Sequence, residues 1–295
     1  MTHKIYRDCV RAGRSSDPRW RAMFTIACLA IPGCASAPLE RSGSLSSYDN
    51  LKRHDGLITK SLVHADSASL KDAKTAKLVP IGFSGHAARA GLSDQERHLV
   101  ANAATRALCN SLSRKFRIMP PDQPADLIVS GTITYIATTD GVASAASQAA
   151  SVATSVLLPV PLPTPRIPIG MGGLSVEAEA RDAQGRQVAA VVWARGADAF
   201  TTKARVSKVG DAYGLVTEFS DDFSHLLKTG TVENSPASLV AAMPSFDDIA
   251  YAIDGKPKAS ACAAYGDGPG LLGAIGANVG TPPEWTDKGG ARQSG

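Results

Sequence analysis

The stretch SDQERHLVANAATRALCNSLSRK at residues 93–115, with the segment ADLIVSGTITYIATTD at 125–140 after it, decides the fold of this chain. Ser93 and Glu96 have the spacing of a capping box, which predicts the start of a helix. Apolar residues then recur at helical spacing as far as Arg114 and Lys115; they are Leu99, Val100, Ala103, Ala104, Ala107, Leu108 and Leu112. The second segment alternates and predicts a strand whose buried face carries Leu127, Val129, Ile133 and Tyr135.

Working outward, further elements complete one domain. AKLVPIGF at 76–83 predicts a core strand with Pro80 at an edge or bulge. LSVEAEARDA at 174–183 and QVAAVVWARGADAF at 187–200 predict a β-hairpin that turns near Gly185. Its first arm is expected to bury Leu174, Val176, Ala178 and Ala180 and to expose Glu177, Glu179 and Arg181.

A second amphipathic helix is expected to end at Gly230. Its apolar residues are Leu215, Val216, Phe219, Phe223, Leu226 and Leu227. The order strand, helix, three strands, helix predicts an α+β fold, with a mainly antiparallel sheet that carries two helices on one face. We place this domain at residues 57–230, between irregular N-terminal and C-terminal extensions.

The N-terminus has the three parts of an export signal. Basic residues extend to Arg21, an apolar run covers 22–31, and small residues surround Cys34. The apolar run is shorter than the roughly 20 residues of a membrane-spanning helix, so a cleaved signal at 1–33 is expected. Ile31, Pro32, Gly33 and Cys34 resemble the lipobox of bacterial lipoproteins, which implies that Cys34 is the lipid-attachment site. A secreted protein without lipid, or a cytoplasmic protein with a buried helix at 22–36, are the alternatives.

After such processing, residues 34–56 would form a polar tether, and two other cysteines, Cys109 and Cys262, would remain. In an oxidising compartment these two are candidates for a disulfide. Sequence alone favours two free thiols slightly, one on a helix and one in a loop, because the distance between them cannot be read from it.

Composition narrows the function classes. The 295 residues have a formal net charge of +4, and several of the basic residues stand in the first 21 positions. After Cys34 the Lys and Arg residues are scattered among acids rather than gathered in a stripe with aromatics. We therefore expect no nucleic-acid partner.

An insertion at 141–168 interrupts the predicted sheet, and its residues 141–165, between Asp140 and Arg166, carry no charge. GVASAASQAASVATSVLLPVPLPTP begins with small residues such as Ala145, Ala149 and Ala153, and ends in a proline-rich, extended half. One hypothesis is an interaction element for self-association or membrane contact. The other is a flexible or loosely helical insertion without a role. Residues 231–295 are rich in Gly and Pro and predict an extended tail.

The sequence predicts no catalytic, cofactor or metal site. Gly268, Gly270 and Gly273 have the spacing of a dinucleotide fingerprint, but no β-run precedes them and no helix is expected after them. The histidines lack the paired spacing of zinc ligands, and the acid pairs Asp221–Asp222 and Asp247–Asp248 are expected to be solvated. GFSGH at 82–86 falls short of a nucleophile elbow, because His86 replaces its last glycine.

The run from SSYDNLK at 46–52 through KTAKLVPIGF and the 93–115 helix to GTITYI at 131–136 resembles a bacterial lipoprotein family, the domain of unknown function 3313. The likeness covers about residues 43–230, and its motifs are structural. It implies export, lipid anchoring and an unassigned activity.

By resemblance to such lipoproteins, Ala35 after the acylated cysteine would permit transport to the outer membrane. We therefore expect a lipid-anchored protein of the cell envelope, on the outer membrane and facing the periplasm. The expected role is that of a non-enzymatic adaptor or assembly protein, which binds a protein partner or itself through 141–168. The alternative is an envelope hydrolase or a small-ligand-binding protein.

Overall fold

The computed structural model describes residues 36–157, 166, 169–199, 201–232 and 246–287. Within these residues eight strands form one sheet in the order β1-β2-β8-β7-β6-β3-β5, with β4 also paired to β6. The strands are β1 (Lys52–Arg53), β2 (Thr59–Ala65), β3 (Thr75–Leu78), β4 (Gly82–Phe83), β5 (Arg117–Ile118), β6 (Leu127–Ala137), β7 (Gly173–Asp182) and β8 (Gln187–Gly196).

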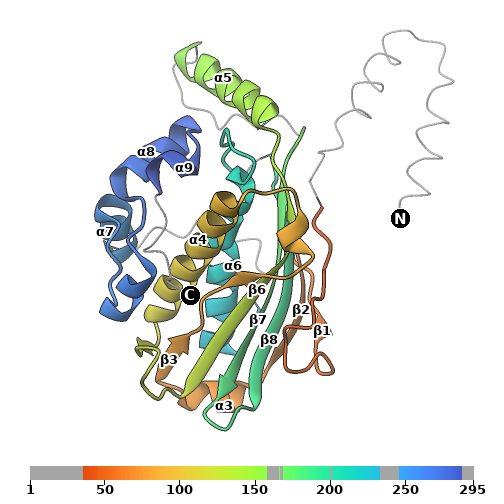
Figure 1. Cartoon of the computed structure of the whole chain (residues 1–295), viewed down its shortest axis with the longest axis vertical. Helices are drawn as coiled ribbons and strands as arrows, with labels where there is room; N and C mark the ends of the chain where they lie inside the picture. Colours follow the sequence, from red (N-terminus) through yellow and green to blue (C-terminus); the bar gives the residue numbers. More distant parts are fainter. Residues whose placement is uncertain (1–35, 158–165, 167–168, 200, 233–245, 288–295) are drawn as a thin grey trace, which may run out of the picture. The chain divides into compact units, whose positions relative to one another are not determined.

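Helices α4 and α6 pack against each other and cover one face of this sheet (Figure 1). The helices are α3 (Ser67–Asp72), α4 (Asp94–Ser113), α5 (Gly141–Leu157), α6 (Gly210–Thr229), α7 (Phe246–Asp254), α8 (Gly270–Val279) and α9 (Pro283–Thr286). The described residues also include two 3-10 turns, η1 (Ala87–Arg89) between β4 and α4, and η3 (Ser260–Tyr265) between α7 and α8. The predicted α+β fold with helices on one face of a sheet is confirmed.

The sheet is mainly antiparallel, as predicted, but it also contains short parallel pairs that the sequence did not predict. Strands β3 and β4 run parallel to β6, and β5 runs parallel to β3. The chain passes through α4 between β3 and β6, and such a helical crossover returns the chain in its original direction. The longer pairs, β2 with β8, β8 with β7, and β7 with β6, are antiparallel.

Helix α4 begins as its sequence predicts. The Ser93 hydroxyl accepts from the backbone N–H of Glu96, and the Glu96 carboxylate accepts from the backbone N–H of Ser93. Helix α6 ends at Gly230, whose φ of 72° is in the left-handed region that favours glycine. Both helix boundaries therefore follow from local capping chemistry.

Two strand predictions need correction. The single strand expected at 76–83 is broken into β3 and β4, and the exposed residues Val79 and Pro80 lie between these two strands. In β6 the register shifts between Ile133 and Tyr135, so Ile136 rather than Tyr135 is buried with the core. A bulge inserts one residue and changes which side chains face inward, which alternation alone cannot foresee.

Residues 246–287 are largely helical, whereas the sequence predicted an extended tail. Helices α7 and α8 pack on each other, α9 packs on α8, and η3 packs on α4 (Figure 1). The glycines of this region provide close contacts between helices as well as turns, and composition does not distinguish these two uses. Residues 288–295, at the end of the predicted tail, lie outside the described part of the chain.

Candidate functional site

Cys34, the predicted lipid-attachment site, lies outside the described residues, as do the predicted signal at 1–33 and Ala35. The described chain starts at Ser36, two positions later. None of the helices in the described ranges combines the length and the apolar character that a membrane crossing requires. The site built below therefore begins with the segment that leads away from Cys34.

Residues 36–48, which we name the N-terminal strap, lie on the face of the sheet opposite α4 and α6. Ala37 and Leu45 are buried, and Leu45 contacts the outward-facing side chains of Ala190 and Val192 on β8. The carbonyl of Pro38 accepts a hydrogen bond of 2.5 Å from the hydroxyl of Ser175 on β7. Residues 36–48 of the predicted tether are thus packed on the domain.

The strap is fastened to the sheet by Glu177, a glutamate of β7 that the sequence predicted to be exposed. Its side chain is fully buried and accepts hydrogen bonds from the hydroxyls of Ser42, Ser44 and Tyr48 at 2.7–2.8 Å. Burial and the hydrogen bond to Glu177 raise the pKa of Tyr48. A buried carboxylate is stable only when donors surround it, and the strap supplies these donors.

Glu179 repeats this arrangement two residues further along β7. Its carboxylate accepts from the backbone N–H and the hydroxyl of Ser46 at 2.7 and 2.8 Å, and from Nε2 of Gln187 at 2.8 Å. Arg181, the third residue predicted to be exposed, is half-buried, and its Nε lies 3.3 Å from Oε1 of Glu179. The alternating serines of the strap thus match the alternating glutamates of the strand.

The insertion at 141–168 is fixed to the domain through Arg166, its one charged residue. Its guanidinium is buried and forms a two-point ion pair with Asp211 in the first turn of α6, with N–O distances of 2.5 and 3.1 Å. Nη2 of Arg166 also donates to the Ser144 hydroxyl on α5 at 3.0 Å, and the Asp211 carboxylate accepts from the backbone N–H of Gly172 at 2.7 Å. The proline-rich residues 158–165 and 167–168 lie outside the description.

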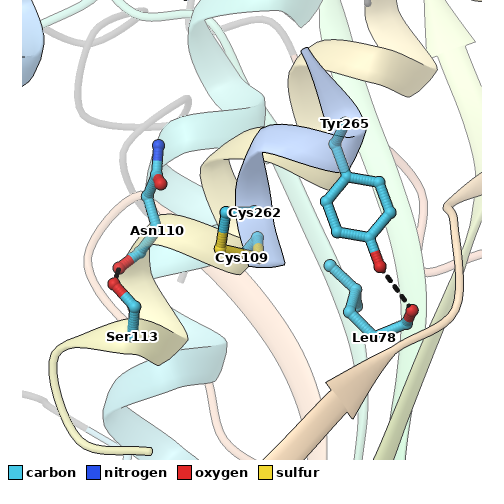
Figure 2. The surroundings of a disulfide bond; sticks show 6 residues. All are labelled: Leu78, Cys109, Asn110, Ser113, Cys262 and Tyr265. Carbon is cyan, nitrogen blue, oxygen red and sulfur yellow. Dashed lines mark hydrogen bonds between the residues drawn. A yellow bond between two sulfur atoms is a disulfide. The ribbon is translucent and has the colours of Figure 1, made fainter. Parts of the chain in front are cut away.

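A disulfide joins Cys109 on α4 to Cys262 in η3 (Figure 2). The structure thus pairs the two thiols that the sequence left open. Beside the bond, the Tyr265 hydroxyl donates to the backbone carbonyl of Leu78 on β3 at 2.7 Å, and burial raises the pKa of this tyrosine. These interactions fasten the start of the C-terminal helices to the core.

The end of the same region is held by a buried charge cluster around Asp287. Its carboxylate forms an ion pair with Arg106 on α4 and accepts a hydrogen bond of 2.6 Å from the hydroxyl of Tyr213 on α6. The guanidinium of Arg205 lies 5.1 Å from the centre of the Tyr213 ring. Burial raises the pKa of Tyr213 and lowers that of Arg205. We assign this cluster to fastening the chain, since the contacts of Asp287 with Arg106 and Tyr213 join segments distant in the sequence.

One shallow hollow of about 500 Å³ lies between η1 and the end of β6. His86, Arg89 and Tyr135 are among its lining residues, and Nδ1 of His86 lies 2.7 Å from Oε1 of Glu40 in the strap. His86 of the segment GFSGH at 82–86 thus makes a histidine–carboxylate contact. Among the described residues, no group of three or more His, Cys, Asp or Glu side chains is arranged to hold a metal ion.

The other predicted features are dispersed. Gly270 does begin a helix, contrary to expectation, but a 3-10 turn rather than a strand precedes it. Asp221 and Asp222 have different partners. Asp221 lies 3.2 Å from Arg114, and the Asp222 carboxylate accepts a hydrogen bond of 2.7 Å from Nε1 of Trp193. Burial of its carboxylate raises the pKa of Asp222 to about 6, although the residue as a whole remains partly exposed. The side chains of the other acid pair lie outside the description.

Glu177, Glu179, Arg166 and Asp211 are the site residues that sequence reasoning missed. A usable signal was present in the strap, where Ser42, Ser44 and Ser46 alternate two residues apart, as do the two glutamates. Nothing local in the sequence pairs Arg166 with Asp211, because 45 residues separate them.

Comparisons with known proteins place the chain in a family without an assigned activity. A family model described as "Protein of unknown function (DUF3313)" matches residues 40–223. The sequence matches none of the curated proteins with which it was compared.

Several solved structures share a distant likeness. Two PelC dodecamer structures from Paraburkholderia phytofirmans match with 14% identity and a TM-score of 0.33, over 56% of this chain and 95% and 96% of those chains. A DUF4136 family protein from Bacteroides thetaiotaomicron VPI-5482 matches with 12% identity and a TM-score of 0.28, over 62% of this chain and 100% of that chain. These likenesses are too distant to transfer a property. Because the family model matches more than half of the 295 residues, the chain belongs to the DUF3313 family.

Proposed function

We propose that this protein is a lipid-anchored lipoprotein of the bacterial cell envelope, attached through Cys34 to the outer membrane and facing the periplasm. The observation that carries the proposal is the Cys109–Cys262 disulfide. Disulfides persist in oxidising compartments and are rare in the cytosol, so the bond supports export. The lipobox-like residues Ile31 to Cys34 support attachment of the exported protein to a membrane of the envelope.

The strap supports the same proposal from a second direction. Ser36 follows Cys34 by only two positions, and Ala37 is already buried against the domain. A lipid on Cys34 would therefore hold a folded domain close to the membrane rather than at the end of a long linker.

We further propose that the protein acts without catalysis, as an adaptor or assembly subunit that presents the 141–168 insertion to a protein partner or to a second copy. The buried charges of Glu177, Arg166 and Asp211 are satisfied by segments of the chain itself. The Arg166–Asp211 pair fixes one end of the insertion, and α5 carries no charged residue. A fixed, uncharged helix is suited to contact with another apolar surface.

The anchor is tested by expressing wild type and Cys34→Ala in a bacterial host, followed by intact-mass analysis and membrane fractionation. We expect a wild-type chain that begins at Cys34 and carries added acyl mass, and a variant that lacks both. A full-length, cytoplasmic wild type would refute export and anchoring together.

The insertion is tested by replacing residues 150–163 with a Gly/Ser sequence of equal length. Removing all of 143–168 would also remove Arg166 and leave Asp211 buried without its partner, so it would confuse stability with binding. We expect normal folding with loss of a crosslinked partner or oligomer. The same replacement at 233–245 is the control. Unchanged size by light scattering and unchanged crosslinks would refute the role of the insertion.

The hollow beside His86 favours a second candidate, a hydrolase or small-ligand-binding protein of the envelope. Its histidine, arginine and tyrosine side chains are able to donate hydrogen bonds to an anionic ligand. Thermal-shift screening of envelope metabolites against wild type and His86→Ala tests this candidate. A ligand that stabilises wild type and not the variant would support it, and equal responses would refute it.

A further inference from the structure

Large apolar side chains are exposed at one end of the described domain. We name this group the anchor-end surface and define it as Leu57, Val142, Ile169, Val206, Ile275 and Val279. Leu57 and Val142 are 81% and 80% exposed, which is far from the burial that such side chains prefer. Single exposed apolar residues are common, but a group of them at one end marks a contact surface.

Contacts between segments distant in the sequence bring these residues together. The backbone N–H of Val206 donates to the carbonyl of Gly280, directly after Val279, at 2.9 Å. A Cβ placed on Gly141, beside Val142, would lie 3.9 Å from the Val206 side chain. In Figure 1, α5 and the neighbouring end of α8 occupy the same end of the domain.

The chain leading from Cys34 enters at this same end. Ser36 and Ala37 line a small hollow together with Leu57 and Asp198. One residue beyond Asp198, the carbonyl of Ala199 accepts from the backbone N–H of Arg166 at 2.8 Å, and the Arg166 side chain contacts α5. The start of the described chain therefore lies near Arg166 and, through it, near the first turn of α5.

Helix α8 is oriented with its apolar side chains outward. Its glycines Gly273 and Gly276 are buried against the rest of the protein, whereas Ile275 and Val279 are 51% and 57% exposed. The helix has no charged residue. A helix in contact with water normally has the opposite arrangement, with its apolar face inward.

The other end of the domain is polar. Gly173 at the start of β7 lies against Ala37, and nine residues later, about 30 Å along the strand, Asp182 lies at the β7–β8 turn, where it pairs with Arg186. Around this turn and α3, the described residues include no exposed large apolar side chain. The other exposed large apolar side chains of the described residues lie on α7–α9 and between β3 and β4; they are Ile249, Ile253, Leu271, Leu272, Trp285 and Val79.

We propose that the anchor-end surface lies on the lipid bilayer, so that the domain is held by the lipid on Cys34 and by these side chains together. The inference rests on the proposed anchoring. Two residues of extended chain span about 7 Å, so an acylated Cys34 places Ser36 at the membrane surface. Apolar side chains of a membrane-lying surface enter the bilayer by about 5–10 Å, a depth consistent with this short reach.

Charge at this end is compatible with anionic headgroups. Lys60, Lys203 and Lys208 are exposed there, against the exposed acids Asp55 and Asp140. Lys60 lines the hollow beside Ser36, and Nζ of Lys203 lies 2.5 Å from Asn278 Oδ1 on α8. Basic side chains beside an apolar surface add to its attraction for anionic lipids.

The test compares two tryptophan reporters in the full chain, Val279→Trp on the anchor-end surface and Val79→Trp between β3 and β4. Both sites are exposed valines, at 57% and 45%. Trp20→Phe and Trp285→Phe remove other signals, and the buried Trp193 serves as an internal reference common to both. The proteins are placed in phosphatidylethanolamine–phosphatidylglycerol vesicles that contain brominated acyl chains, and acylation of Cys34 is read from intact mass.

We expect brominated lipid to quench the Val279→Trp reporter at least about twofold more than the Val79→Trp reporter. With Cys34 acylated, equal and weak quenching of both would refute bilayer contact and leave the anchor intact. Without acylation the anchoring proposal falls, and the same comparison on the unacylated chain mixed with vesicles still decides bilayer contact. If the Val279→Trp reporter is shielded from aqueous iodide and from brominated lipid alike, a protein covers the surface and the inference is wrong.

Discussion

Breaking the Arg166–Asp211 ion pair is expected to destabilise the protein strongly, whereas removing both charges is not. The pair is almost fully enclosed, with 4% of the arginine side chain and 0% of the aspartate side chain exposed. Asp211 accepts two hydrogen bonds from Arg166 and one from the backbone N–H of Gly172, and Arg166 also donates to Ser144. Each charge therefore depends on the other for compensation.

Arg166→Met leaves the Asp211 carboxylate buried without a cation, and Asp211→Leu leaves the guanidinium buried without an anion. Either change is expected to lower the free energy of unfolding by about 3 to 5 kcal/mol, the usual cost of breaking a buried ion pair. The double variant replaces both charges by apolar side chains and is expected to lie within about 2 kcal/mol of wild type, since no buried charge is left unpaired.

The assay is urea unfolding followed by the fluorescence of the buried Trp193, with wild type, both single variants and the double variant at one pH. Arg114→Met is the control, because the Arg114–Asp221 pair is half-exposed and contributes at most about 1 kcal/mol. Additive losses, with the double variant as unstable as the two single changes combined, would refute the reasoning. So would single variants that resemble the Arg114 control.

Three further predictions concern the strap, the disulfide and an acid on α6. Glu177→Leu removes the acceptor of three strap hydroxyls and is expected to lower the free energy of unfolding by about 2 kcal/mol. Proteolytic cleavage within 36–48 should then become faster, and cleavage at the wild-type rate would contradict this. Replacing Cys109 and Cys262 by alanine opens a loop of 153 residues and is expected to lower the free energy of unfolding by up to about 5 kcal/mol. Denaturant titrations measure this loss, and equal unfolding midpoints for wild type and variant would contradict the prediction. Burial raises the pKa of Asp222 to about 6, so its protonated form favours the folded state, and this stability is present below pH 4 and is lost as the pH rises through 6. Asp222→Asn is therefore expected to gain about 1 kcal/mol over wild type at pH 7.5 and less at pH 4.5, after allowance for solvent screening of this partly exposed residue, and a pH-independent difference in unfolding free energy would contradict it.

Local patterns predicted much of the scaffold. The capping box of Ser93 and Glu96 fixed the start of α4, and Gly230 fixed the end of α6, since both signals act through neighbouring backbone groups. Strand β6 and the β7–β8 hairpin were likewise found where alternation predicts them. The parallel pairing of β3 with β6 was missed, because strand order depends on where a crossover returns the chain.

The candidate site was less accessible to prediction. Glu177 and Glu179 alternate with apolar residues and therefore carry the pattern of a strand that faces water. They are buried because a segment more than 120 residues away lies over them and supplies serine and tyrosine donors. Alternation reports which residues share a face, and it does not report what covers that face.

The sequence by itself determined the class of fold, the capped helices, the hairpin and the family, and its N-terminal residues supply the hypothesis of a lipid anchor. These features depend on interactions between residues near one another in the chain, or on motifs that are contiguous. Only the tertiary structure decided that the predicted tether is a strap, that Cys109 meets Cys262, that Arg166 meets Asp211, and that α8 turns its glycines inward. Each of these depends on packing between distant segments, where burial of a charge or of a small residue is settled by its neighbours in space.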